Sequence, residues 1–181
     1  MAWEFALLDA IQAHLRTAAG DFCMPLISAL GNHGLLWVVL ALALLIPKKT
    51  RRTGLVLSAA LALDWGLCNG LLKPLVARTR PYDINTAIQL IAAKPHDYSF
   101  PSGHTAAAFT AVSALCQCKS RLFWPFFVCA GLIAFSRLYL YMHFPTDVLA
   151  GIVLGWGFGW MGAKLVAWGE AAYAARAKAK P

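Results

Sequence analysis

Five apolar segments constrain the fold of this chain more than any other feature of its sequence. They are residues 34–47, 53–76, 105–116, 122–142 and 147–168. A helix needs about 20 residues to cross a bilayer, so the third segment must recruit its flanking residues. The composition is that of a membrane protein, because 60% of the residues are hydrophobic and only 13% are charged. The sequence therefore predicts an all-α, polytopic membrane helix bundle of about five transmembrane helices, formed as a single domain by residues 1–181.

The first 30 residues predict a helical segment at the membrane interface. Phe5, Leu8, Ile11 and Leu15 fall on one face of a helix, which is typical of an amphipathic helix that lies on the membrane surface. A short helix from Phe22 to Leu30 is expected to precede the first apolar segment. Residues 1–30 are thus predicted to flank the bundle.

Short clusters of basic residues predict which ends of the spans face the cytoplasm. The clusters are Lys48, Lys49, Arg51 and Arg52; Lys119 and Arg121; and Arg176, Lys178 and Lys180. An alternating path places all three on one side, which the positive-inside bias makes cytoplasmic. The tail 169–181 is then cytoplasmic, and the N-terminus, the loop 77–101 and the turn near 142–147 lie outside. These clusters account for the net charge of +8, and we expect no nucleic-acid partner.

Three polar clusters fall at the outer ends of the predicted spans. They are Lys73 to Arg80-Pro81, then Pro101-Ser102-Gly103-His104, and finally Ser136-Arg137 to His143 and Asp147. Two crossings separate His104 from His143, so the two histidines share one side of the membrane. The same side gathers three cations, a hydroxyl group and a helix N-terminus opened by a glycine. This combination of groups suits a phosphate.

The remaining polar side chains supply the chemistry of phosphate transfer. Asp147 lies four residues after His143, a spacing that can bring the two side chains together. A carboxylate bound to one ring nitrogen leaves the lone pair of the other nitrogen free, which makes His143 a candidate nucleophile. His104 is then placed to protonate the leaving oxygen and later to activate water. We expect no metal and no cofactor, because Asp83, Asp97 and Asp147 are too scattered for a two-metal site.

The three clusters together resemble the signature of the type 2 phosphatidic acid phosphatase superfamily, which includes integral-membrane lipid phosphatases and vanadium haloperoxidases. The signature is Lys-x6-Arg-Pro, Pro-Ser-Gly-His and Ser-Arg-x5-His-x3-Asp, and all three parts occur here in order, within a catalytic core of residues 50–165. The resemblance implies a phosphohistidine on His143, oriented by Asp147, with His104 as acid and base. It implies phosphate binding by Lys73, Arg80, Ser102, Gly103 and Arg137.

The site at the ends of the spans favours a lipid phosphate, whose tail stays in the bilayer. By analogy with small bacterial family members, the first expected substrate is undecaprenyl pyrophosphate, hydrolysed to undecaprenyl phosphate in a multi-pass protein of the plasma membrane with an extracytoplasmic active site. Phosphatidate, phosphatidylglycerol phosphate or phosphotransfer to another acceptor remain alternatives. A non-catalytic lipid-binding or transport protein is disfavoured, because binding needs only the cations.

Several polar or small residues fall outside the signature. Arg78 is interpreted as a loop or headgroup contact, and Lys94, His96 and Asp97 as residues of a solvated loop that can also select a headgroup. Asp64 lies inside the second apolar segment, so we expect it to face the bundle and to have a polar partner. Gly151, Gly155 and Gly159 form a close-packing helix face, used within the bundle or in a homodimer.

Overall fold

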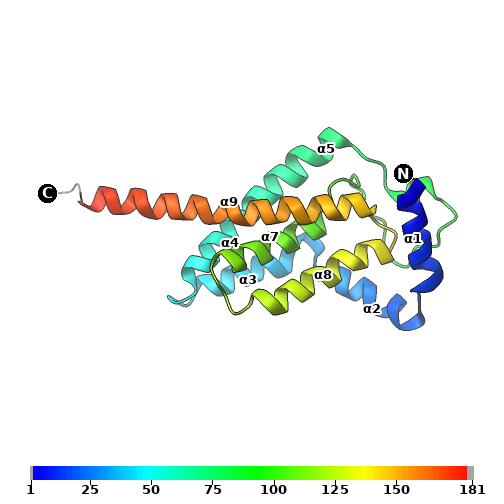
Figure 1. Cartoon of the computed structure of the whole chain (residues 1–181), viewed down its shortest axis with the longest axis horizontal. Coiled ribbons are helices and arrows are strands. Elements are labelled where there is room, and N and C mark those ends of the chain that lie inside the picture. Colours follow the sequence, from blue (N-terminus) through cyan, green and yellow to red (C-terminus); the bar gives the residue numbers. More distant parts are fainter. Residues whose placement is uncertain (1, 179–181) are drawn as a thin grey trace.

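The computed structural model describes residues 2–178, and every regular element within them is a helix. The central element is α7 (Gly103–Gln117), which packs against α4 (Arg51–Asp64), α8 (Phe123–Tyr139) and α9 (Pro145–Lys178). Figure 1 shows the long helix α9 running along the bundle and extending beyond it towards the C-terminus. The all-α helix bundle that the sequence predicts is confirmed.

Each of the five apolar segments is helical. The first is α3 (Leu35–Leu45), and the second is α4 continued by η2 (Trp65–Leu72) and α5 (Lys73–Val76). The other three form α7, α8 and α9. Two helices, Arg51–Ile84 and Pro145–Lys178, are long and apolar enough to cross a membrane, and α2 (Ala18–Ala29) with Asn32–Leu45 forms a third candidate that is bent by 43°. The shorter apolar helix α8 has 17 residues, and the count of five spans stays a prediction.

Small residues set the distance between α7 and α9. A Cβ atom added at Gly155 would lie 2.4 Å from the carbonyl oxygen of Ala106, and one added at Gly159 would lie 2.4 Å from Cβ of Ser113. Gly151 makes a similar approach to the backbone of Ser102. Of the two predicted uses of this glycine face, the structure shows packing within the bundle. In this structure α7 covers the face, and the homodimer stays a prediction.

The segment η2 is a π-helix, in which the backbone N–H of Lys73 reaches the carbonyl oxygen of Cys68, five residues earlier. Pro74 follows directly, and a proline ring clashes with the carbonyl four residues before it in a regular α-helix. Widening the turn before Pro74 relieves this clash. Gly66 and Gly70 add backbone freedom in the same stretch. The hydropathy pattern does not reveal this change of helix type.

Helix α1 (Ala2–His14) lies across one end of the bundle (Figure 1). Its residues Leu8 and Ile11 are buried in a cluster with Tyr139–Met142, and the ring of Phe5 meets that of Phe144 edge to face at 5.2 Å. Much of the apolar face predicted to rest on the membrane therefore packs on protein. The short helices η1 (Asn32–Gly34) and α6 (Pro81–Ile84) complete the elements.

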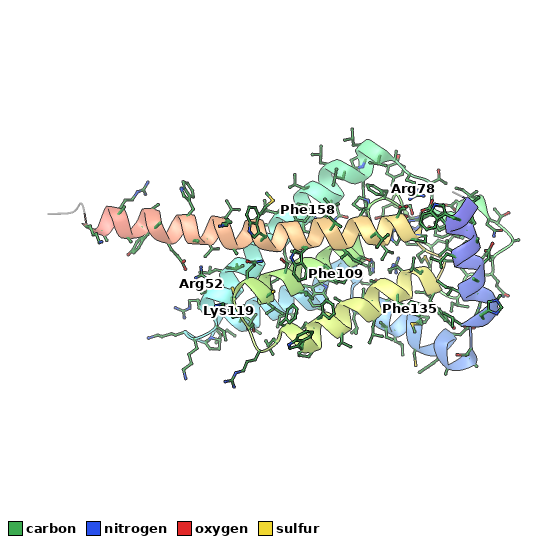
Figure 2. All side chains as sticks on the ribbon, in the orientation of Figure 1. Arg52, Arg78, Phe109, Lys119, Phe135 and Phe158 are labelled. Atoms are coloured by element: carbon green, nitrogen blue, oxygen red, sulfur yellow. The ribbon has the colours of Figure 1, made fainter. Side chains whose placement is uncertain are left out.

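The basic clusters lie at the other end of the bundle. Figure 2 shows Arg52 and Lys119 at the end opposite Arg78. Arg52 pairs with Glu170 of α9 at 3.1 Å. Helix α9 continues to Lys178, so most of the predicted tail 169–181 extends the last helix; Lys180 lies outside the described residues. This arrangement agrees with the prediction that the basic clusters lie at one end of the bundle.

Candidate active site

The predicted site residues come from four places in the fold that meet at the α1 end of the bundle. Lys73 follows η2 and Arg80 precedes α6; Ser102, Gly103 and His104 begin α7; Arg137 lies in the last turn of α8; and His143 and Asp147 flank the start of α9. Most of these side chains are buried. Arg80 contacts His143 directly, and the carboxylate of Asp97, which is not among the predicted phosphate ligands, joins Lys73 to Arg80.

His143 is buried and held at both ring nitrogens. Its Nδ1 lies 2.7 Å from the carbonyl oxygen of Ser99, which accepts a hydrogen bond, and its Nε2 lies 3.2 Å from Nη1 of Arg80. Since a carbonyl only accepts and a guanidinium only donates, the neutral ring carries its proton on Nδ1 and its lone pair on Nε2. Burial, and then the charges of Arg80, Arg137 and Lys73, lower the pKa of His143 well below 6.5. The ring therefore presents an unprotonated Nε2 to the cations.

Asp147 lies next to His143, as their spacing predicts, but the two side chains are not hydrogen-bonded to each other. Its Oδ2 is 3.7 Å from Nδ1 of His143, and instead accepts hydrogen bonds from Oγ of Ser99 at 2.5 Å and from the backbone N–H of Phe144 at 2.9 Å. The reason is that α9 begins at Pro145, so Asp147 lies in its first turn and caps the helix, as the acidic residue of a capping box does. Ser99 thus links the carboxylate to the histidine, with its hydroxyl on one and its carbonyl on the other.

Arg78 holds the same carboxylate from the other side. Its Nη1 donates to Oδ1 of Asp147 at 2.5 Å and to Oγ1 of Thr146 at 2.7 Å, and its Nη2 donates to Glu4 of α1 at 2.8 Å. The guanidinium also lies 4.1 Å from the centre of the Phe144 ring. Arg78 therefore ties α1 to the start of α9, which corrects its interpretation as a loop or headgroup contact.

Asp97 bridges two of the predicted phosphate ligands. Its carboxylate accepts hydrogen bonds from Nζ of Lys73 and, at 2.6 Å, from Nη2 of Arg80. Partial burial acts to raise the pKa of Asp97, but the hydrogen bond from Lys73 and the charges of Lys73 and Arg80 outweigh it and hold the pKa at about 2. Asp97 is therefore a charged occupant of the cationic site and not a freely solvated residue of the loop.

The start of α7 shows why a glycine is needed there. A Cβ atom added at Gly103 would lie 3.5 Å from Nζ of Lys73, an ordinary contact, but 3.3 Å from Oδ1 of Asn69, so a side chain would crowd the asparagine. Ser102 is fully buried, and its hydroxyl lies 3.0 Å from that of Thr105. Nε2 of His104 lies 2.9 Å from Oδ1 of Asn32, which accepts a hydrogen bond from it. The glycine thus lets Asn69 approach the N-terminus of α7.

Arg137 completes the basic group from α8. It is buried, and its Nη1 donates a hydrogen bond to Oγ of Ser28 on α2. Its Nε has no hydrogen-bond partner among the described residues. A buried guanidinium with an unused donor is suited to bind an anion.

A cavity of about 1270 Å³ opens beside these groups. Lys73, Asp97, His104 and Arg137 line its polar part. Apolar residues of α3 and α4 line the rest, including Val38, Ala41, Leu42, Leu61 and Ala62. Arg80 and His143 are not in the lining, but Asp97 is, and Asp97 binds Arg80. The cavity therefore combines a cationic end with an apolar wall.

The sequence does not predict the roles of three contributors to this site: Arg78 and Asp97 are interpreted from it only as loop residues able to contact a headgroup, and Ser99 is not singled out. One feature of the sequence indicates a role for Arg78: it is a cation on the predicted outer side and lies within the first motif. Asp97 and Ser99 lie in an irregular loop where no periodicity predicts which way a side chain points. Their roles come only from the folding of that loop against the start of α9.

Comparison with known proteins places this geometry in a family. The family model of the PAP2 superfamily matches residues 53–170. An undecaprenyl-diphosphatase of Sulfolobus acidocaldarius is 35% identical over 122 residues, which are 66% of this chain and 58% of that protein's length. A decaprenylphosphoryl-5-phosphoribose phosphatase of Mycobacterium tuberculosis is 34% identical over 155 residues, 84% of each chain.

The fold has a solved counterpart as well. The crystal structure of the first transmembrane PAP2 type phosphatidylglycerolphosphate phosphatase from Bacillus subtilis superposes with a TM-score of 0.73 and 26% sequence identity, covering 91% of this chain and 84% of that one. The matched family segment contains all three polar clusters, and these relatives are named phosphatases. The chain therefore belongs to the PAP2 superfamily, a family that includes membrane-embedded lipid phosphatases.

Proposed function

We propose that the chain hydrolyses the phosphate of a membrane lipid through a phosphohistidine formed on His143. The observation that carries this proposal is the state of the His143 ring, with Nδ1 donating to Ser99 and the Nε2 lone pair beside Arg80. A lone pair held among cations is suited to attack a phosphorus atom whose oxygens those cations bind. A protein that only binds lipids has no need of a histidine fixed in this way.

The reaction divides into two transfers. Lys73, Arg80 and Arg137 hold the phosphate oxygens in place of Asp97. When Arg80 turns to the phosphate, its hydrogen bond to Nε2 of His143 is released, and Nε2 forms a bond to phosphorus while the bond to the leaving oxygen breaks. The imidazolium form of His104 gives one proton to that oxygen and becomes the neutral ring. In the second step His104 takes a proton from water, the hydroxide attacks phosphorus, and the N–P bond breaks to release inorganic phosphate. Asp147 and Ser99 keep the ring oriented throughout.

The shape of the cavity supports a lipid as the substrate. Its cationic end accommodates a phosphate, and its apolar wall on α3 and α4 accommodates the start of a hydrocarbon tail. Undecaprenyl diphosphate, hydrolysed to undecaprenyl phosphate, is one candidate, in line with the name of the Sulfolobus relative. A polyprenyl-linked sugar phosphate is a second, favoured by the mycobacterial relative that matches 84% of both chains. The active site is proposed to face the outside of the plasma membrane, because the basic turns lie at the other end.

Phosphate release by the protein purified in detergent tests the proposal. A panel of lipid phosphates is supplied in the presence of EDTA, and we expect turnover without added metal that vanadate inhibits. His143→Ala is expected to remove it, whereas His14→Ala, which changes an exposed histidine of α1, leaves it intact. Unchanged turnover in His143→Ala, or turnover only with added Mg²⁺, contradicts this mechanism. Transfer of phosphate to an added alcohol instead of water identifies a phosphotransferase.

A further inference from the structure

Asp64 is a buried carboxylate that the proposed reaction does not use. It is the last residue of α4, its exposed fraction is 3%, and it lines the cavity. The thiol of Cys68 is hydrogen-bonded to this carboxylate, but Oδ1 is buried and has no hydrogen-bond partner among the described residues. An unsatisfied carboxylate oxygen in such a place is unfavourable, so a group that satisfies it when the cavity is filled is expected.

The π-helix explains how Asp64 and Lys73 come to line the same cavity. Nine residues separate them, which in an α-helix is two and a half turns and places them on opposite faces. Residues 65–72 instead form a π-helix, whose turn of about 4.4 residues makes the same interval close to two full turns. Asn69, between them, also lines the cavity, and its Oδ1 lies close to Gly103 at the start of α7.

Asp64 lies where the two parts of the cavity join. Leu61, one turn earlier on α4, belongs to the apolar wall, and Lys73 belongs to the cationic end. When a lipid phosphate fills the cavity, the atoms between its phosphate and its tail come to lie near Asp64 and Asn69. Those atoms are the part of the substrate that distinguishes one lipid phosphate from another.

The charges around Asp64 determine which chemical group of the substrate is able to bind beside it. A second phosphate beside Asp64 is repelled by a carboxylate of the same sign, and an ammonium group is repelled by Lys73 and Arg137. A neutral hydroxyl group meets neither difficulty, because it donates a hydrogen bond to Oδ1 of Asp64 while the Asn69 amide accepts or donates a second one.

We propose that Asp64 and Asn69 form a binding site for the hydroxyl groups of a sugar or polyol that links the phosphate to the lipid tail. The inference rests on the proposed function in one respect only, that a lipid phosphate enters this cavity. It narrows the substrate class to lipids whose phosphate is carried on a hydroxylated headgroup. Simple prenyl diphosphates lack the donor that Asp64 needs.

Three substrates with similar tails test the inference on the full-length protein in detergent: dodecyl glucoside 6-phosphate, dodecyl phosphate and farnesyl diphosphate. We expect the wild-type protein to have the highest kcat/KM for the glucoside. Asp64→Leu should lower that kcat/KM by about ten- to a hundredfold, the effect of losing a hydrogen bond to a charged acceptor. The kcat/KM for dodecyl phosphate should be unchanged, and Asp64→Asn should retain part of the preference.

The matched control is Asp83→Leu, which makes the same change at an exposed position of α6 outside the cavity and should leave the preference intact. Thermal unfolding separates recognition from a structural role. Removing an unsatisfied buried carboxylate raises the Tm of Asp64→Leu, whereas loss of a structural contact lowers it. If Asp64→Leu does not fold, Asp64→Asn carries the same comparison.

An equal loss of kcat/KM on all three substrates, or no change on any, overturns the hydroxyl site. So does a wild-type protein that turns over dodecyl phosphate and farnesyl diphosphate with no preference for the glucoside, although it leaves the proposed phosphatase standing. A wild-type protein that turns over none of the three overturns both proposals.

Discussion

Among single residues, Asp97 has the most direct consequence for substrate binding. Its carboxylate is bound by Lys73 and Arg80, the same cations that the proposed mechanism assigns to the phosphate. A phosphate that enters must therefore displace Asp97. Because the side chain is 49% exposed and sits on an irregular loop, it is able to leave without disturbing a helix.

Replacing Asp97 is expected to strengthen phosphate binding. In Asp97→Asn the two ion pairs are gone before the substrate arrives, so KM and the inhibition constant of vanadate should fall by about two- to tenfold, the range for partly exposed ion pairs. Steady-state kinetics on a lipid phosphate measures both constants. Asp83→Asn is the control, because the exposed Asp83 carboxylate makes no hydrogen bond or ion pair to Lys73 or Arg80 among the described residues. A rise in KM would mean that Asp97 positions the cations and does not compete with phosphate.

Arg78 is expected to matter for stability and turnover together. Arg78→Met removes the cation that faces the fully buried Asp147, and an uncompensated buried charge destabilises a fold by about 3–5 kcal/mol. The Tm and kcat should both fall, because Asp147 also orients Ser99 and through it His143. Lys164→Met, at an exposed lysine of α9, should change neither. A normal kcat with a lowered Tm would limit Arg78 to holding α1.

The depressed pKa of His143 predicts how its ring responds to pH. Since burial and the neighbouring cations hold this pKa well below 6.5, the neutral ring persists as the pH falls from 8 to 6. Its contribution to folding is present above about pH 6.5, where an unfolded histidine is also neutral, and is lost as the pH falls further and the unfolded chain binds the proton. In an NMR titration, the ring resonance that disappears in His143→Ala should not shift between pH 8 and 6. A midpoint near 6.5 would contradict the environment described for this ring.

The motif residues were predictable from the sequence, but their contacts were not. The spacing of the motifs and the even number of membrane crossings between them predict that His104, His143 and the three cations lie at one end of the bundle. The structure confirms this placement. The link from Asp147 to His143 through Ser99 depends on the turn at Phe144 and Pro145. That turn, like the loop that carries Asp97, has no periodic pattern from which a side-chain direction follows.

At the level of helices, apolar periodicity predicted where each helix lies but not what kind it is. The π-helical stretch η2 follows from Pro74 and its neighbours, yet nothing in hydropathy distinguishes it from α-helix. Its effect is large, since it rotates Lys73 relative to Asp64 and so decides which polar residues face the cavity. The glycines of α9 were predicted as a packing face, and identifying α7 as the partner required the fold.

The close contact of α7 with α9 predicts opposite effects of two neighbouring glycine substitutions. In Gly155→Ala the new methyl group meets Ala106 and Thr110 at under 3 Å, and such overpacking destabilises by about 1–3 kcal/mol. Beyond its own helical turn, no atom of the described residues lies within 4 Å of a Cβ added at Gly157, so Gly157→Ala should be neutral or stabilise by about 0.5–1 kcal/mol through helix propensity. Thermal unfolding in detergent compares the two variants. Equal Tm values would mean that α7 and α9 lie further apart than described.

Over the whole molecule, the two ends of the bundle differ in chemistry. One end holds α1 and the irregular loop, while the other holds the basic turns and the continuation of α9 (Figures 1 and 2). The cationic part of the cavity belongs to the first end. The positive-inside bias predicts that the second end faces the cytoplasm. The cations at the first end do not count against this bias, because they are buried around Asp97 in the proposed phosphate site and are not exposed loop charges.

This two-ended arrangement predicts which positions a membrane-impermeant reagent reaches. In a variant with the five native cysteines replaced, Leu90→Cys lies in the loop of the active-site end and Thr50→Cys lies in a basic turn at the other. A charged maleimide added to intact cells should label position 90, and should label position 50 only after the membrane is permeabilised. Phosphatase activity of each variant serves as the control for folding. The opposite labelling pattern would place the site in the cytoplasm, and the substrate would then have to present its phosphate at the inner face.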